Sequence, residues 1–382
     1  MSTDTNLPPH LAMSNASRAM LAKCRKLVPP MLEKFHKGQL GRVAVIGGSA
    51  DYTGAPYFSA MASARLGCDL SYVFCEPSAA PTIKSYSPNL MVSPILRSTT
   101  SLGANKEPSD KELAQPIIDM LPRLHVLVIG PGLGRDEVTQ RQVKAVVQAA
   151  RNYDPPVPMV LDADALWLIQ TDPDLIKGYP ECILTPNVVE FGRLAKACGL
   201  EDLDHDPTTN CQKLAEILGG VCIIQKGPVD YISQGKDTTI SDFKGGLKRA
   251  GGQGDTLTGS LGTFLGWRAC YHEGLWDVGE EPMSRPETLL VAAFAGSAIT
   301  RECSRRAFAK KARALQASDL TEEVHESYLS LIGEPEYKVD KSNAHIYVPI
   351  SREQSDSVAR DFKSPDLLPY SEGIQTFGYS LK

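Results

Sequence analysis

Several features that define common functional classes are absent from this sequence of 382 residues. Its nine cysteines include no CxxC pair, and its seven histidines show no spacing typical of metal ligands. A disulfide framework and a zinc site are therefore disfavoured. Neither GxGxxG nor GxxxxGKS/T occurs, which also disfavours a dehydrogenase with the usual dinucleotide-binding motif and a phosphate-loop NTPase.

An excess of positive charge and a long hydrophobic run are missing as well. Lys and Arg number 40 against 45 Asp and Glu, which gives a formal net charge of −5. A dedicated nucleic-acid binder carries a basic surplus, and a helix that spans a bilayer needs about 20 apolar residues. The composition therefore predicts a globular protein that binds neither nucleic acid nor membrane.

The scattered cysteines favour a reducing compartment, and the N-terminus lacks the features of a secretory signal. We therefore expect a cytoplasmic protein. Four basic residues between Arg18 and Lys26, with few acidic ones nearby, leave a mitochondrial form as the alternative. Pro29 and Pro30 count against that alternative, because proline interrupts an amphipathic helix.

Short apolar runs alternate with segments of helical spacing over the first 225 residues. Runs that are apolar throughout suit strands buried on both faces. The alternation predicts an α/β fold with a parallel sheet and right-handed crossovers. The expected strands are 43–46, 70–75, 125–129, 159–161, 182–184 and 222–225, and the expected helices are 57–66, 139–153, 188–197 and 211–218.

The pattern changes after residue 225. Two β-type runs, 229–233 and 238–241, are separated by Gln234 to Lys236 and predict a hairpin at the end of the sheet. Two long helices are expected at 255–271 and 287–307, the second a buried core helix. Segments 98–116, 272–285 and 333–356 lack sustained periodicity and are interpreted as polar surface insertions.

No internal repeat and no linker divides the chain into two cores. We predict an N-terminal extension over residues 1–27 and a single domain over 28–330. Residues 331–382 are expected to form an insertion and a C-terminal segment that packs on the same domain. The polar insertions leave the oligomeric state open, a homo-oligomer included.

The most informative stretch is the glycine-rich run that ends in Asp255 (Gly245-Gly246-Leu247-Lys248-Arg249-Ala250-Gly251-Gly252-Gln253-Gly254). Glycines let the backbone approach an anion closely, and the helix expected to begin near Asp255 directs free N–H groups at it. Asp255 has two interpretations. It is either an N-cap, or the base that accepts a proton from a hydroxyl attacking a phosphate.

Other polar residues follow predicted strands, where ligands bind in open α/β sheets. Asp162 and Asp164 could hold Mg²⁺ through water or order the floor of a pocket, or they form a polar turn with an N-cap. Asn187 could cap a helix and Glu190 would complete a capping box. Lys226 is either a surface charge or a contact to nucleotide phosphates.

Six motifs, taken in order, resemble those of the ATP-dependent (S)-NAD(P)H-hydrate dehydratases over roughly residues 28–325. The motifs are Gly47-Gly48-Ser49 with Tyr52-Thr53-Gly54-Ala55-Pro56, Gly130-Pro131-Gly132-Leu133-Gly134, Leu161-Asp162-Ala163-Asp164-Ala165, Thr185-Pro186-Asn187 with Glu190-Phe191, Lys226-Gly227, and Gly251-Gly252-Gln253-Gly254-Asp255. The resemblance implies the ribokinase-like fold, a three-layer α/β/α sandwich with a central, mostly parallel sheet.

The same resemblance implies a hydro-lyase that repairs hydrated NADH and NADPH. Such an enzyme restores the reduced ring, with release of ADP and phosphate, by phosphorylating the C6 hydroxyl and eliminating phosphate. It implies ATP as co-substrate and Mg²⁺ as cofactor, with most of the Mg²⁺ ligands from phosphate and water. Asp255 resembles the catalytic base. Nothing in the motifs chooses between the hydrates of NADH and NADPH.

The binding segments are also carried over by resemblance. The expected hydrate-binding residues are Gly134, Asn187, Val188, Val189, Glu190, Phe191, Gly192, Arg193 and Asp255. The expected ATP-binding residues are Lys226, Gly227, Pro228, Val229, Asp230, Gly245, Gly246, Leu247, Lys248, Arg249, Ala250, Gly251, Gly252, Gln253 and Gly254.

Two other functions share these motifs. A small-alcohol kinase of the same fold, acting on a vitamin precursor such as a hydroxymethyl pyrimidine or a thiazole, would use the same phosphate site and the same base. A non-catalytic nucleotide-binding scaffold is disfavoured, because it has no need for a costly acidic group at an anion site. Fold alone does not separate these functions.

Overall fold

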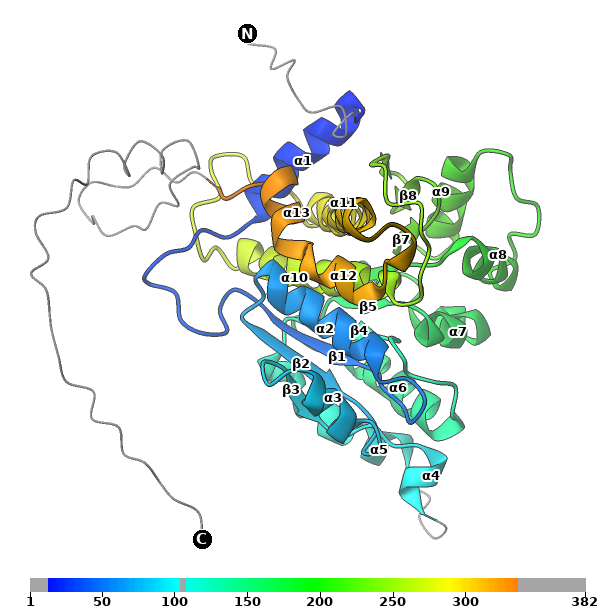
Figure 1. Cartoon of the computed structure of the whole chain (residues 1–382). Coiled ribbons are helices and arrows are strands. Elements are labelled where there is room, and N and C mark those ends of the chain that lie inside the picture. The colour runs from blue at the N-terminus through cyan, green and yellow to red at the C-terminus, as the bar shows by residue number, and fades with distance from the viewer. Residues whose placement is uncertain (1–12, 104–107, 336–382) are drawn as a thin grey trace, which may run out of the picture. The chain divides into compact units, whose positions relative to one another are not determined.

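The computed structural model describes residues 13–103 and 108–335, and a nine-stranded sheet forms the centre of this part of the chain (Figure 1). The strand order is β3-β2-β1-β4-β5-β6-β7-β8-β9. Pairing is parallel from β3 through β7, whereas β8 and β9 are antiparallel. Met31–Glu33 fall outside the compact unit built on this sheet, to which the other described residues belong.

The strands are short, and most are buried on both faces, as the apolar runs predict. They are β1 (Arg42–Ile46), β2 (Leu70–Phe74), β3 (Met91–Ser93), β4 (Val126–Ile129), β5 (Met159–Leu161), β6 (Cys182–Leu184), β7 (Cys222–Gln225), β8 (Asp230–Ser233) and β9 (Thr238–Ser241).

The helices include the four expected before residue 225 and the two long ones after it. They are α1 (Asn15–Leu27), α2 (Gly54–Leu66), α3 (Ala80–Tyr86), α4 (Thr99–Leu102), α5 (Asp110–Ile118), α6 (Glu137–Arg151), α7 (Asp164–Thr171), α8 (Val188–Ala197), α9 (Pro207–Ile217), α10 (Gln253–His272), α11 (Arg285–Lys311), α12 (Ala317–Glu322) and α13 (Val324–Leu331). None of the described helices is long and apolar enough to cross a membrane.

Two apolar cores lie on opposite faces of the sheet, because successive side chains of a strand point to opposite sides. In β1, Val43 and Val45 belong to one core, whereas Ala44 and Ile46 belong to the other. The first core is closed by α1 to α3 and α10 to α13, and the second by α5 to α9 (Figure 1). The predicted three-layer α/β/α sandwich is therefore confirmed.

The predicted hairpin is also confirmed, since β8 and β9 pair in antiparallel register from Asp230–Ser241 to Ser233–Thr238. The segment 98–116, which the sequence predicts as a polar surface insertion, has regular structure of its own. This segment contains α4 and most of α5, and each of these helices starts with a capping box, at Ser98 and Ser109. The insertion predicted at 333–356 lies outside the described residues from position 336 onward.

Candidate active site

The candidate site lies at the edge of the sheet where the parallel strands end, and the chain order reverses at that edge between β1 and β4. Here the loops after β1 and β4 pack directly on each other. The Gly48 N–H donates to the Gly132 carbonyl at 3.0 Å, and a Cβ at Gly47 would lie 2.0 Å from the Pro131 carbonyl oxygen. Glycine is required at position 47 because the two backbones leave no room for a side chain.

The predicted substrate residue Gly134 is held from both sides. Its N–H donates to Asp164 Oδ2 at 3.0 Å, and its carbonyl accepts from Gln140 Nε2 at 2.7 Å. Asp164 also pairs with Arg135. Of the interpretations of Asp164, the N-cap was wrong, because the N-cap of α7 is Ala163. Its carboxylate instead orders the loop after β4.

The Asn187 segment starts α8 in the way that its sequence predicts. Asn187 Oδ1 accepts from the N–H groups of Val189 and Glu190, and the Glu190 carboxylate accepts from the Asn187 N–H, which confirms the capping box. Val188, Val189 and Arg193 are exposed, and Gly192 is half-buried. Phe191 is different, since its side chain is buried in the second core and leaves only its backbone for a ligand.

A cavity of about 410 Å³ opens between the ends of β6 and β7, the glycine-rich run and α11. Among its lining residues are nine that the sequence predicts as binding residues: Asn187, Lys226, Gly227, Pro228, Asp230, Gly245, Arg249, Gln253 and Gly254. It is completed by five residues that were not predicted: Leu257, Thr300, Arg301, Ser304 and Leu320. The remaining predicted residues do not line this cavity.

Arg301 is the most connected of the unpredicted residues. Its guanidinium donates to Asp230 Oδ1 at 2.8 Å, to the Phe243 carbonyl at 2.6 Å and to the carbonyls of Gly227 and Pro228. Asp230 also accepts from the Gly227 N–H at 3.1 Å. Asp230 and Arg301 therefore fix the turn after β7. The sequence offered no signal for Arg301, because it lies inside a long helix.

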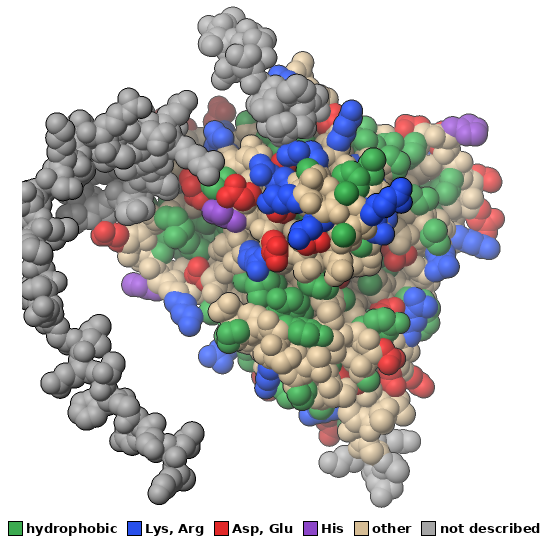
Figure 2. All heavy atoms as spheres, viewed as in Figure 1, with side chains coloured by type: hydrophobic (Ala, Val, Ile, Leu, Met, Phe, Trp, Pro, Cys, Tyr) green, Lys and Arg blue, Asp and Glu red, His purple; other side chains and the backbone are tan. Residues whose placement is uncertain are grey.

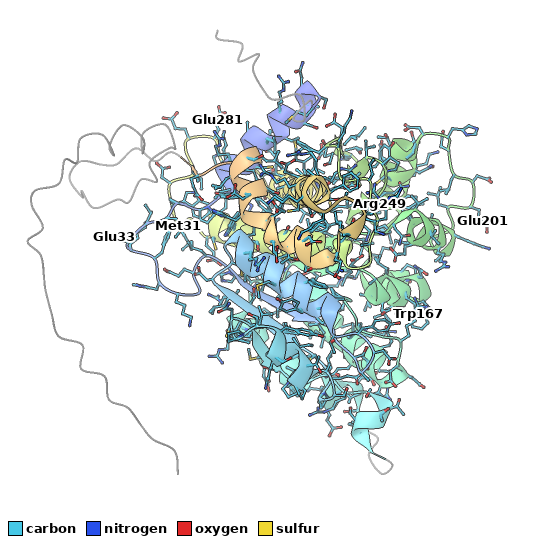
Figure 3. All side chains as sticks on the ribbon, in the orientation of Figure 1. Met31, Glu33, Trp167, Glu201, Arg249 and Glu281 are labelled. Carbon is cyan, nitrogen blue, oxygen red and sulfur yellow. The ribbon has the colours of Figure 1, made fainter. Side chains whose placement is uncertain are left out.

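The glycine-rich run docks onto α11. The Gly246 N–H donates to Ser304 Oγ at 3.2 Å, and a Cβ at Gly246 would lie 2.5 Å from the Ser304 carbonyl. Arg249 donates to the Gly246 carbonyl and lies beside α11 in Figure 3. Lys and Arg side chains gather on the face of the molecule that carries α11 and α13 (Figure 2). This positive charge favours an anionic ligand.

Asp255 does not cap α10. The N-cap is Gly252, at φ +89°, and no side chain accepts a capping hydrogen bond there. Asp255 instead lies in the first turn, 7% exposed. Burial, and then the Asp162 charge, raise the pKa of Asp255 well above its usual range, and only the Lys226 ammonium acts in the opposite direction. The capping interpretation is therefore wrong.

Lys226 extends from the end of β7 into the cleft floor. Its Nζ lies 2.9 Å from Asp162 Oδ1, and its side chain is only 24% exposed. Burial alone would lower the pKa of Lys226, but the neighbouring carboxylates, Asp162 above all, raise it above its ordinary value. Lys226 is thus a charged group inside the cleft, and the surface-charge interpretation was wrong.

The described residues contain no group of three or more His, Cys, Asp or Glu side chains able to hold a metal ion. Mg²⁺ does not require such a cage, because it commonly binds with several waters and the phosphates of its substrate. A Mg²⁺ ion that arrives with ATP would therefore take its ligands chiefly from phosphate oxygens and water.

Solved structures with this architecture identify the fold class. A ribokinase-like superfamily protein from Enterococcus faecalis matches with a TM-score of 0.61 at 21% identity, over 83% of this chain and 95% of its own. An ADP/ATP-dependent NAD(P)H-hydrate dehydratase from Bacillus subtilis, co-crystallised with ATP and Mg²⁺, matches with a TM-score of 0.56 at 23% identity, over 81% of this chain and 97% of its own. The fold is ribokinase-like.

Comparison with sequences then identifies the family. Residues 43–326 match the family model described as NAD(P)H-hydrate dehydratase. The ATP-dependent (S)-NAD(P)H-hydrate dehydratase of Emericella nidulans is 60% identical over 360 residues, covering 85% of this chain and 96% of the relative. The ATP-dependent (S)-NAD(P)H-hydrate dehydratase of Schizosaccharomyces pombe is 49% identical over 315 residues, covering 82% of this chain and 93% of the relative. The chain belongs to the NAD(P)H-hydrate dehydratase family.

Proposed function

We propose that this protein removes water from the S form of hydrated NADH and NADPH, using ATP and releasing ADP and phosphate. The observation that carries the proposal is Asp255, a buried carboxylate in the first turn of α10 that caps no helix. Burial and the Asp162 charge raise the pKa of Asp255, so this carboxylate binds a proton more readily than an exposed aspartate does. An aspartate with a purely structural role would not be expected at this position, because burying an unpaired carboxylate destabilises the folded protein.

The chemistry needs a phosphoryl donor because hydroxide leaves poorly near neutral pH. Asp255 accepts the proton of the C6 hydroxyl as its oxygen attacks the γ-phosphorus of ATP, and ADP leaves. The C6–O bond of the resulting ester then breaks with release of phosphate, and loss of a proton from C5 restores the ring double bond. The backbone N–H groups at the start of α10 stabilise the charge on the transferring phosphoryl group.

We assign the cavity beside α11 to ATP, because it joins the turn at Lys226–Asp230 to the glycine-rich run. Mg²⁺ bound with ATP would supply charge neutralisation at the phosphates there. The hydrate then lies toward Gly134 and the exposed start of α8, so that its ring reaches Asp255. Leu247 is 84% exposed beside the ATP cavity, at a position open to a ligand.

We also propose that the protein works in the cytoplasm and binds neither membrane nor nucleic acid. The cytoplasmic location is supported by its nine free cysteines, of which eight are buried, since free thiols persist in a reducing compartment. A homo-oligomer stays a prediction from the sequence, and size-exclusion chromatography coupled to light scattering measures the size of the assembly.

The test is recovery of the reduced-nicotinamide absorbance from hydrated NADH in the presence of ATP and Mg²⁺. We expect recovery in step with ADP and phosphate release. Asp255→Asn should lower the rate by about 10²- to 10⁴-fold, the usual contribution of a general base, while ATP still binds. Asp172→Asn, which removes an aspartate from a surface ion pair with Lys144, is the matched control. Stable phosphorylation of a vitamin alcohol, without cofactor recovery, would instead establish a kinase.

A further inference from the structure

Asp162 lies at the floor of the cleft with no role in the proposed chemistry so far. It is 4% exposed and follows β5, two strands away from Lys226 at the end of β7. Its Oδ1 accepts from Lys226 Nζ at 2.9 Å. Both groups face α10, since a Cβ at Gly254 would lie 3.5 Å from Asp162 Oδ2 and 3.6 Å from Lys226 Nζ. The ion pair therefore lies directly beneath the first turn of α10.

The backbone around Asp162 is held unusually firmly. A Cβ at Gly130, which has φ +122°, would lie 1.8 Å from the Asp162 carbonyl oxygen, so only glycine allows the loop after β4 to pack there. The next residue, Ala163, has φ +49° and ψ −118°, a conformation that is costly for any residue with a side chain. Such backbone strain clusters at functional sites.

Lys226 has three carboxylates within electrostatic reach, Asp162, Glu190 and Asp255, yet its hydrogen bond goes to Asp162. This choice matters because an ammonium paired with Asp255 would stabilise the ionised base and weaken its ability to accept a proton. Pairing with Asp162 keeps the ammonium in the cleft and leaves the Asp255 carboxylate free for the hydroxyl.

We propose that Asp162 is a positioning residue for phosphoryl transfer, which holds the Lys226 ammonium beneath the first turn of α10 and away from Asp255. From that position the ammonium neutralises charge on the transferring phosphoryl group. The proposal rests on the proposed function in that it assigns a phosphoryl-transfer step to this cleft. It assigns Asp162 no contact with either substrate.

The test is a double-mutant cycle with Asp162→Asn, Lys226→Gln and the combined variant. Initial rates of ADP formation are measured against ATP concentration to separate kcat from KM. If Asp162 acts through Lys226, each single variant lowers kcat by about 10- to 100-fold, as expected for a misplaced catalytic group. The combined variant is then no slower than the slower single variant, because residues that act as a unit are not additive.

Three results would overturn the proposal. They are an unchanged kcat in Asp162→Asn, an effect confined to KM for ATP, and losses in the two single variants that multiply in the combined one. Asp172→Asn controls for loss of one aspartate–lysine pair, here Asp172 to Lys144 at 2.7 Å. Thermal unfolding shows whether each variant is folded, and Asp162→Glu supplies a variant that keeps the charge and should recover part of kcat.

ADP formation keeps this test separate from the proposed function. If the wild-type protein forms ADP with a vitamin alcohol and not with hydrated NADH, the proposed function fails. The same cycle then tests Asp162 on the alcohol, because the phosphoryl-transfer step is common to both acceptors. If hydrated NADH is the acceptor and the losses multiply, the function stands and the role of Asp162 fails.

Discussion

At the scale of single residues, the sequence locates the chemistry but leaves the role of several groups open. Asp255 is a plausible N-cap until the structure shows that Gly252 occupies that position. Asn187 and Glu190 form the capping box that their spacing predicts. Spacing along a helix is a local property and can be read from sequence, whereas the pairing of Asp162 with Lys226 depends on the order of β5, β6 and β7 in the sheet.

The cost of Asp255 to stability gives a prediction at this scale. Because its pKa is raised in the folded protein, the folded state holds the proton more tightly than the unfolded chain. The contribution of Asp255 to the free energy of unfolding therefore falls as pH rises from the ordinary pKa of aspartate, about 4, through the raised pKa of the folded state. Asp255→Asn should raise Tm by roughly 2 °C or more at neutral pH and lose that advantage on acidification. A variant less stable than the wild type at neutral pH would contradict this account.

At the scale of elements, six strands were predictable because each is a short, largely buried apolar run, and β8 and β9 because a turn separates two β-type runs. The exception is β3, whose three residues are half-buried at the edge of the sheet and give no such signal. Helix α7 was missed because two aspartates at its start were interpreted as a polar turn. Apolar periodicity reports burial, so elements at an edge or beside the cleft are the ones it overlooks.

The packing of α10 on α2 yields a prediction for elements. A Cβ at Gly259 would lie 2.0 Å from the Ser59 carbonyl oxygen, so Gly259→Ala must push the two helices apart. We expect a loss of at least about 1–3 kcal/mol in the free energy of unfolding. Gly192→Ala is the comparison, because nothing lies within 4 Å of that position in α8. It should gain about 0.5–1 kcal/mol, and urea unfolding measures both.

At the scale of the whole molecule, five of the six family motifs meet because each follows a parallel strand at the same edge of one sheet, and the sixth, the glycine-rich run, follows the terminal hairpin. That convergence follows from the α/β pattern and was predictable. The side of the ATP cavity formed by α11 was not predictable from the sequence. Its residues Thr300, Arg301 and Ser304 come from a helix that begins more than 50 residues after β7. Helices that close a cleft from a distance carry no motif of their own.

A buried ion pair connects the sheet to two helices at the ends of the strands opposite to the candidate active site. Arg268 of α10 pairs with Glu181, just before β6, and donates to the Arg285 carbonyl at the start of α11 at 3.0 Å. Arg268→Met should cost about 3 kcal/mol, the lower end for a broken buried pair, since it leaves the buried Glu181 charge with only the exposed Arg285, at 3.9 Å. Adding Glu181→Leu should recover most of that loss in urea unfolding. A single variant as stable as the wild type would show that this tie contributes little.

The most direct test of the central claim follows the oxygen of the C6 hydroxyl. The substrate is prepared by hydrating NADH in water labelled with the heavy oxygen isotope, and the reaction is run with ATP in ordinary water. If the hydroxyl attacks ATP with Asp255 as base, the label appears in the released phosphate, one atom for each cofactor restored. Phosphate without label, with the heavy oxygen lost to water, would contradict phosphorylation of the C6 hydroxyl.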